Sequence, residues 1–217
     1  MKPKCLISGN NRKRDHSNYV IILLSVFIMF FMISLALFLQ EIGEAENWIR
    51  DMGNPQVNTD GAILHNIGLI VIGIGLIFHF LYILQQLRDK FFTLALIGTI
   101  SSIIGSVGVL LAGIMNPTVG SLHDIWTNIG LGGILIGHVF YTGIFLYSHL
   151  NGLKRHPSIK SMIITNAPII LFVVLIFVYY GGETLDAGMA AVVQFVAYFC
   201  ALFFVLGDFV GLPDKRP

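Results

Sequence analysis

The chain has 217 residues, of which 55% are hydrophobic and only 12% charged, and its mean hydropathy is +0.80. Soluble globular domains are about 45–50% apolar and about 25% charged, so this composition excludes an ordinary soluble protein and predicts an integral membrane protein. The formal net charge of +1 gives no reason to expect a nucleic-acid partner.

Apolar runs long enough for a bilayer, about 17 to 25 residues each, follow one another along the chain. They occur at about 19–40, 62–86, 91–114, 124–148, 161–180 and 187–208. They predict an all-α fold, an integral membrane bundle of six transmembrane helices over residues 19–208, because the short connections leave no room for a soluble domain. A basic tail at 1–18 precedes the bundle and a second tail at 209–217 follows it. The first run is longer than the core of a signal peptide and no small-residue cleavage site follows, so we expect an uncleaved helix.

The basic residues are segregated by side. Of the 13 Lys and Arg residues, all except Arg50 fall in the tails or in the loops on the same side of the predicted bundle. The positive-inside rule then places both the N-terminus and the C-terminus in the cytoplasm. We expect the cell (plasma) membrane as the location.

Glycine is concentrated in the predicted helices at 62–86, 91–114 and 124–148. Small residues let helix backbones approach closely in lipid, so these three helices are expected to form the centre of the bundle. The other three are rich in Phe, Ile, Leu and Val and are expected to face membrane lipids. Their apolar surfaces also allow a homo-oligomer.

Polar side chains recur at two levels of the predicted helices at 62–86 and 124–148. His65 and His79 are 14 residues apart, as are Asp124 and His138, which separates the members of each pair by about 21 Å along a helix. The outer layer draws on Asp51, His65, Asn66, His123, Asp124 and Asn128. The inner layer draws on His79, Tyr82, His138 and Tyr141.

Ionisable groups cost about 2.5–3.5 kcal/mol at the centre of a transmembrane helix, so they tend to face a cavity or a partner. The outer layer therefore predicts a polar, ligand-binding pocket near the outer leaflet. The alternative is that these groups lie close enough to the membrane surface for water to reach them. For the inner layer, a proton relay or a headgroup contact competes with simple hydrogen bonds between helices.

A metal site is a second interpretation of the outer layer. His65, His123 and Asp124 could supply three ligands to zinc or iron and leave a position for a reactive water. No HxxxH or HExxH spacing places two such ligands on one helical face. The set would have to be gathered from separate helices.

Two segments carry a family resemblance. The stretch "NWIRDMGNPQVNTDGAILHNIGLIVIGIG" and the later "GVLLAGIMNPTVGSLHDIWTNIG" resemble a prokaryotic membrane family called domain of unknown function 998, over roughly residues 47 to 140. The family's "F-P-E" is "MNP" at residues 115–117, so the role of that carboxylate does not carry over. The layout is also similar to the eukaryotic Frag/DRAM/Sfk group, which is associated with lipid remodelling. By that likeness the motif positions are Asp51, Gly53, Asn66 and His123.

The leading hypothesis is a multi-pass membrane protein that handles a lipid without catalysis, with the segment "RDMGNPQVNTDG" at 50–61 covering the outer pocket. One alternative is a metal-dependent intramembrane hydrolase acting on a lipid. Another is a small ion- or proton-coupled transporter. The serine-hydrolase elbow, the Walker loop and the haem attachment motif do not occur in the sequence.

Overall fold

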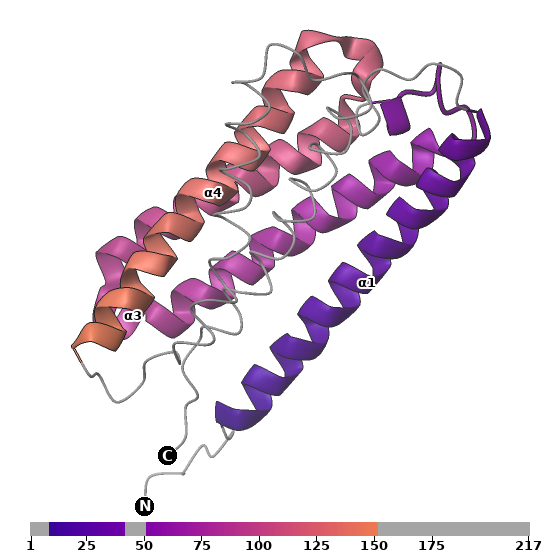
Figure 1. Ribbon diagram of the computed structural model, residues 1–217. Coiled ribbons are helices and arrows are strands. Elements are labelled where there is room, and N and C mark those ends of the chain that lie inside the picture. The colour runs from indigo at the N-terminus through magenta and orange to yellow at the C-terminus, as the bar shows by residue number, and fades with distance from the viewer. Residues whose placement is uncertain (1–8, 42–50, 152–217) are drawn as a thin grey trace, which may run out of the picture.

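The computed structural model describes residues 9–41 and 51–151, and within these ranges its long elements are all α-helices (Figure 1). They are α1 (Gly9–Glu41), α3 (Ala62–Ile114) and α4 (Ser121–Leu150), with the short 3₁₀ helix η1 (Pro117–Val119) between the last two. Each of the three α-helices is long and apolar enough to cross a membrane. The all-helical class is therefore confirmed for this part of the chain, and its three long apolar helices agree with the expected membrane protein. The helices expected at 161–180 and 187–208 and the tail at 209–217 lie outside the described residues.

Helix α1 begins at Gly9, well before the apolar run that starts at Tyr19. Part of the expected N-terminal tail is therefore helical. No glycine or proline interrupts the sequence between Gly9 and Tyr19, so the backbone has no local reason to leave the helix there. The hydropathy profile marks only the start of the apolar run at Tyr19, whereas the helix itself begins earlier, at Gly9.

Element α3 covers two helices that the sequence predicted, at 62–86 and 91–114, and joins them across a kink. A straight helix of its 53 residues would be about 80 Å long. The backbone leaves helical geometry at Phe91 (φ −132°, ψ 36°), directly after the exposed charged residues 88–90. The chain folds back there, so α3 consists of a first arm (62–90) and a second arm (92–114).

The two arms pack side by side in opposite directions. A Cβ placed on Gly73 of the first arm would lie 2.8 Å from the backbone nitrogen of Leu110 in the second. A Cβ placed on Gly113 would lie 2.6 Å from the carbonyl oxygen of Asn66. These contacts pair the start of the first arm with the end of the second. The two predicted helices thus exist as the arms of a helical hairpin.

The second arm and α4 are in direct backbone contact. Added Cβ atoms at Gly105 and Gly108 would each lie 2.5 Å from a backbone nitrogen of α4, at Ile134 and Gly130 respectively. Gly133 approaches Gly105 equally closely from the other side. The expected close packing through glycine is therefore confirmed for this pair of helices.

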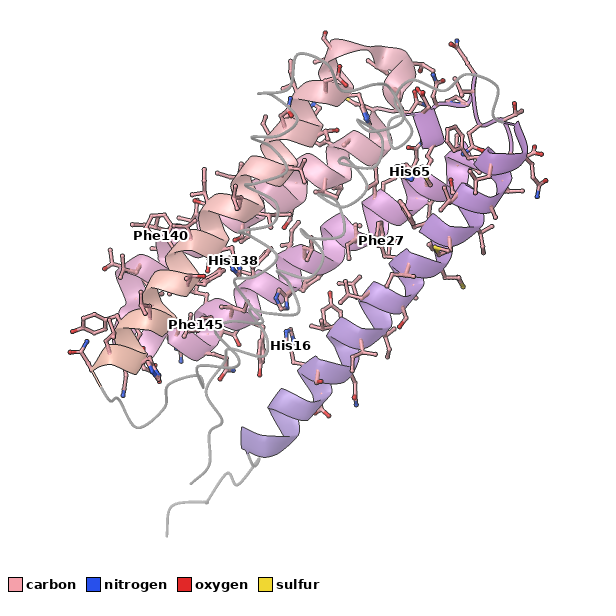
Figure 2. The ribbon with its side chains drawn as sticks, viewed as in Figure 1. His16, Phe27, His65, His138, Phe140 and Phe145 are labelled. Atoms are coloured by element: carbon pink, nitrogen blue, oxygen red, sulfur yellow. The ribbon has the colours of Figure 1, made fainter. Side chains whose placement is uncertain are left out.

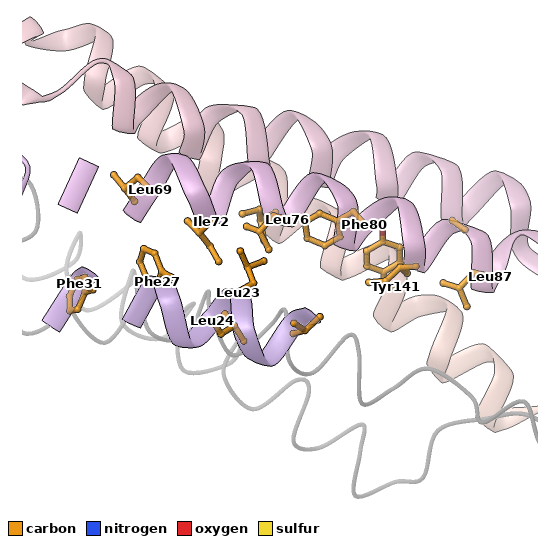
Figure 3. Packing of buried hydrophobic residues seen from close by; sticks show 14 of the residues in the cluster. Leu23, Leu24, Phe27, Phe31, Leu69, Ile72, Leu76, Phe80, Leu87 and Tyr141 are labelled. Atoms are coloured by element: carbon orange, nitrogen blue, oxygen red, sulfur yellow. The ribbon is translucent and has the colours of Figure 1, made fainter. Parts of the chain in front are cut away.

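An apolar cluster joins α1 to the first arm of α3 (Figure 3). Leu23 and Phe27 of α1 cover Gly75 and Gly68 of the first arm. Phe80 continues the cluster and stacks on Tyr141 of α4, with ring centroids 6.2 Å apart. The first arm therefore contacts α1 along its length and reaches α4 at its far end.

The segment at 51–61 is fixed by Asn58, which is fully buried. Its side-chain Nδ2 donates to the carbonyl of Met52 at 2.7 Å and to the hydroxyl of Ser34 in α1 at 3.2 Å. Its Oδ1 accepts from the backbone N–H of Gly61 at 2.9 Å. One side chain thus ties this segment to α1 and to the start of α3.

Candidate functional site

Two groups of buried and half-buried polar side chains lie at two levels of α3's first arm, and Figure 2 labels His65 of one group and His16 of the other. The outer polar cluster consists of His65, Asn66 and His123, with Gly53 beside them. The inner imidazole cluster consists of His16, His79, Tyr82 and Tyr19. His65, Asn66 and His123 were expected in the outer layer and His79 and Tyr82 in the inner layer, whereas His16 and Tyr19 were expected in neither.

His123 closes the end of the preceding helix. Its Nδ1 lies 3.1 Å from the carbonyl oxygen of Ala112 and 2.8 Å from that of Met115. The last carbonyls of a helix have no partner within the helix, so a donor at this position satisfies groups that would otherwise be costly to bury. The tight turn at Gly120 (φ 67°) leads directly into α4 and brings His123 back to these carbonyls.

His65 and Asn66 open the first arm of α3 next to His123. The His65 side chain is 4% exposed and that of His123 is 7% exposed. Asn66 donates from Nδ2 to the carbonyl of Gly53 at 3.0 Å. Its Oδ1 is buried and has no hydrogen-bond partner among the described residues.

Three other residues predicted for the outer layer lie differently. Asn128 is exposed, whereas Asp51 and Asp124 are partly buried. Asp124 stands in the first turn of α4, where a carboxylate interacts favourably with the helix dipole. The helical face that carries Asp124 and Asn128 is therefore only partly buried.

The predicted metal triad is not assembled. Within residues 9–41 and 51–151, no group of three or more His, Cys, Asp or Glu side chains is placed to hold a metal ion. This concerns His65, His123 and Asp124 directly, since all three lie in that range. His123 uses Nδ1 for the carbonyls of α3 instead.

The inner imidazole cluster joins α1 to the first arm of α3. His16 Nε2 lies 3.1 Å from His79 Nδ1, and the His16 ring stacks on Tyr82 with centroids 3.6 Å apart. Tyr19, one turn further along α1, donates to the carbonyl of Gly75 at 2.8 Å. His79 is fully buried, and its Nε2 has no hydrogen-bond partner within the part of the chain described.

His138 and Tyr141, the other residues predicted for the inner layer, lie on α4. Both are almost fully buried. The Tyr141 hydroxyl forms a hydrogen bond with Thr99 Oγ1 at 3.0 Å, which links α4 to the second arm. The simpler interpretation of the inner layer, as hydrogen bonds between helices, accounts for this contact.

The residue that the sequence analysis missed is His16. It was assigned to the basic tail at 1–18, yet α1 carries it against His79 and Tyr82. The available signal was its spacing, since His16 precedes Tyr19 by three residues and therefore shares a helical face with it.

Comparison with known proteins adds no assignment: no protein-family model, no curated protein and no solved structure matches the chain.

Proposed function

We propose that this protein is a multi-pass membrane protein that binds the headgroup of a membrane lipid at the outer polar cluster, without catalysing a reaction on it. The proposal includes six transmembrane helices, both termini in the cytoplasm and a location in the cell membrane. It also includes a relationship to the domain of unknown function 998 family and the Frag/DRAM/Sfk group. The motif positions of that resemblance include Asn66 and His123.

The observation that carries the proposal is the buried Asn66 Oδ1 without a partner among the described residues. A buried acceptor that finds no donor costs about 1–3 kcal/mol, so it is an expensive feature to keep in a membrane helix. It stands beside His65, because Asn66 Oδ1 and the His65 ring both approach Gly53. A ligand that supplies the missing hydrogen bond would recover this cost.

The location supports a lipid rather than a soluble ligand. The cluster lies where α3 and α4 begin, and both helices are apolar enough to cross a membrane. A headgroup that enters from the adjacent leaflet reaches the start of such helices while its acyl chains stay in the hydrocarbon. Large apolar side chains such as Ile63 and Leu122 are exposed beside the cluster and can contact those chains.

The test is native mass spectrometry of the protein released from nanodiscs that contain a defined lipid mixture. We expect one lipid to remain bound to the wild type and to be lost in His65→Leu and in Asn66→Leu. Asn128→Leu is the matched control, because it removes an exposed amide from α4 and should leave lipid retention unchanged. Equal retention in all four proteins would refute the proposal.

Sidedness is tested separately. Single cysteines at Asn10 and Gln56, placed in a Cys5→Ser/Cys200→Ser background, are labelled with a membrane-impermeant maleimide in whole cells. We expect labelling at Gln56, which is exposed, and none at Asn10 until the cells are lysed. The reverse pattern would invert the proposed orientation.

A further inference from the structure

The side chains of His16 in α1 and His79 in the first arm of α3 meet nitrogen to nitrogen. His16 Nε2 lies 3.1 Å from His79 Nδ1, and the two ring planes are inclined by only 14°. The ring centroids are 5.3 Å apart, which is close to the greatest separation that this nitrogen–nitrogen distance allows. The two rings are therefore nearly coplanar, and the hydrogen bond runs almost in line with both of them.

This geometry leaves no room for a metal ion between the two nitrogens. Two metal–nitrogen bonds of about 2.0–2.1 Å, each aimed along a ring axis, would hold the nitrogens about 4 Å apart. The observed distance is that of a hydrogen bond. One proton must lie between the nitrogens, because two lone pairs that face each other at this distance would repel.

The two outer nitrogens of this pair, His16 Nδ1 and His79 Nε2, differ in their surroundings. A neutral imidazole has one donor and one acceptor nitrogen, so one outer nitrogen is a donor and the other an acceptor in either tautomer of the neutral pair. His79 Nε2 is buried and has no hydrogen-bond partner among the described residues. His16 is only half-buried, so a proton can reach the pair from its side.

The hydrogen bond alone does not explain why both positions carry an imidazole. An amide side chain at either position could take part in the same hydrogen bond. The buried Nε2 of His79 is a costly group to keep in the interior of a membrane helix. The property that an imidazole has and an amide lacks is the capacity to take up a proton.

Uptake of one proton raises the charge of the pair by one. When His16 Nδ1 accepts a proton from water, both nitrogens of His16 carry hydrogen, and Nε2 donates to His79 Nδ1. The bridging proton can then cross along the in-line bond to His79 Nδ1, which moves the positive charge from one ring to the other. The charge is thereby spread over two imidazoles, and a hydrogen bond that involves a charged group is roughly twice as strong as a neutral one.

Burial opposes a charge at this position, and the neighbouring aromatic rings offset that cost. The Tyr82 ring lies against the His16 ring, with centroids 3.6 Å apart and planes inclined by 13°. A cation over the face of an aromatic ring is attracted by the quadrupole of that ring. Tyr19 also faces His16, with centroids 5.6 Å apart, and its hydroxyl donates to the carbonyl of Gly75.

The other titratable groups on the surrounding helices are charged only where they are exposed. Asp15 of α1 and Arg88 of the first arm are both exposed. Helix α4 reaches Phe80 through Tyr141 and carries His138 three residues earlier. A second proton on the pair would place two positive charges a few ångströms apart, and their repulsion limits the uptake to one.

We propose that His16 and His79 form a proton-binding site, which takes up one proton from water at the polar start of α1 and shares it between the two rings. The site does not include any residue of the outer polar cluster, so this inference does not depend on the proposed lipid binding. Uptake places one positive charge in the contact between α1 and the first arm of α3.

The test is nitrogen NMR of the wild-type protein with isotope-labelled histidine. A nitrogen–nitrogen coupling across the hydrogen bond identifies the pair, so the measurement needs no variant to fold. The pH is lowered from about 8 to about 4, which exceeds the range in which imidazoles ordinarily change charge. We expect the ring signals of both residues to change in one common step that corresponds to one proton for each pair.

Two variants keep a hydrogen bond and remove the sharing. His16→Gln places an amide where Nε2 was, and His79→Asn places one where Nδ1 was. Both should keep a Tm close to that of the wild type at neutral pH, because an amide can replace either partner of this bond. Neither should show the common step. His149→Gln, in the last turn of α4, is the matched control and should leave the common step unchanged.

Three results would overturn the proposal. A coupling that persists while neither ring signal changes over the whole pH range would leave a purely structural hydrogen bond. Two separate steps, each retained when the other histidine is replaced, would mean that the rings bind protons independently. Absence of the coupling at every pH would refute the contact between His16 and His79 itself.

Discussion

Replacement of Gly105 by alanine should separate α4 from the second arm of α3. The added Cβ would lie 2.5 Å from the nitrogen of Ile134, 2.8 Å from the carbonyl oxygen of Gly130 and 2.9 Å from the carbonyl carbon of Gly133. Ordinary contacts between such atoms are about 3.5–4 Å. All three neighbours are backbone atoms, so no side chain can rotate away and α4 itself must move by roughly 1 Å.

The expected magnitude is the difference of two opposing effects. Overpacking a well-packed contact costs about 1–3 kcal/mol, and backbone neighbours place Gly105 at the upper end. Alanine in place of glycine in a helix recovers about 1 kcal/mol. The net loss in the free energy of unfolding is therefore about 2 kcal/mol for Gly105→Ala.

Gly143→Ala is the matched control on α4. Gly143 is exposed, and a Cβ there would meet no heavy atom within 4 Å. Only the helical preference of alanine remains, so this variant should be more stable than the wild type by about 0.5–1 kcal/mol. Reversible unfolding in mixed micelles measures both variants on one scale. If Gly105→Ala proved as stable as Gly143→Ala, the backbone contact between α4 and the second arm would be refuted.

Other contacts give further expectations. Asn58→Leu removes three hydrogen bonds from a buried position and should destabilise the segment at 51–61 by about 2–4 kcal/mol. The rate of limited proteolysis within that segment should therefore rise. An unchanged cleavage rate would contradict the anchoring role of Asn58. His16→Ala should weaken the attachment of α1 by about 1–2 kcal/mol, because the contact with His79 and the ring stacking are lost. The Tm of this variant should therefore be lower than that of the wild type, whereas Asp15→Ala, at an exposed position, is the control and should leave the Tm unchanged. Tyr141→Phe and Thr99→Val should each lower the free energy of unfolding by about 1 kcal/mol. The double variant should lose little more than either single variant, because the two substitutions remove the same hydrogen bond. Additive losses would mean that the two hydroxyls do not interact.

The long helices could be predicted from the sequence because hydropathy alone defines them. The runs at 62–86 and 91–114 match the two arms of α3, and the run at 124–148 lies within α4. The start of α1 could not be predicted in this way, because polar residues form the first part of the helix, before the apolar run begins at Tyr19. His16 was overlooked for that reason.

The outer polar cluster was predicted in part. His65 and Asn66 both approach Gly53, and His123 contacts the carbonyls at the end of α3. Helical periodicity places Asn128 on the same face as Asp124, but burial depends on which neighbour that face meets, and Asn128 is exposed. The contact of His123 with the carbonyls of Ala112 and Met115 depends on the turn at Gly120, which no periodicity encodes.

The contact of α3 with α4 and its contact with α1 differ in how much displacement of the neighbouring helix they can accommodate. Against α4, the second arm offers glycine backbones, which have no rotamers to change. Against the first arm, α1 offers Leu and Phe side chains such as Leu23 and Phe27, which can repack at modest cost. We therefore expect the contact between α4 and the second arm to tolerate less displacement than the contact between α1 and the first arm.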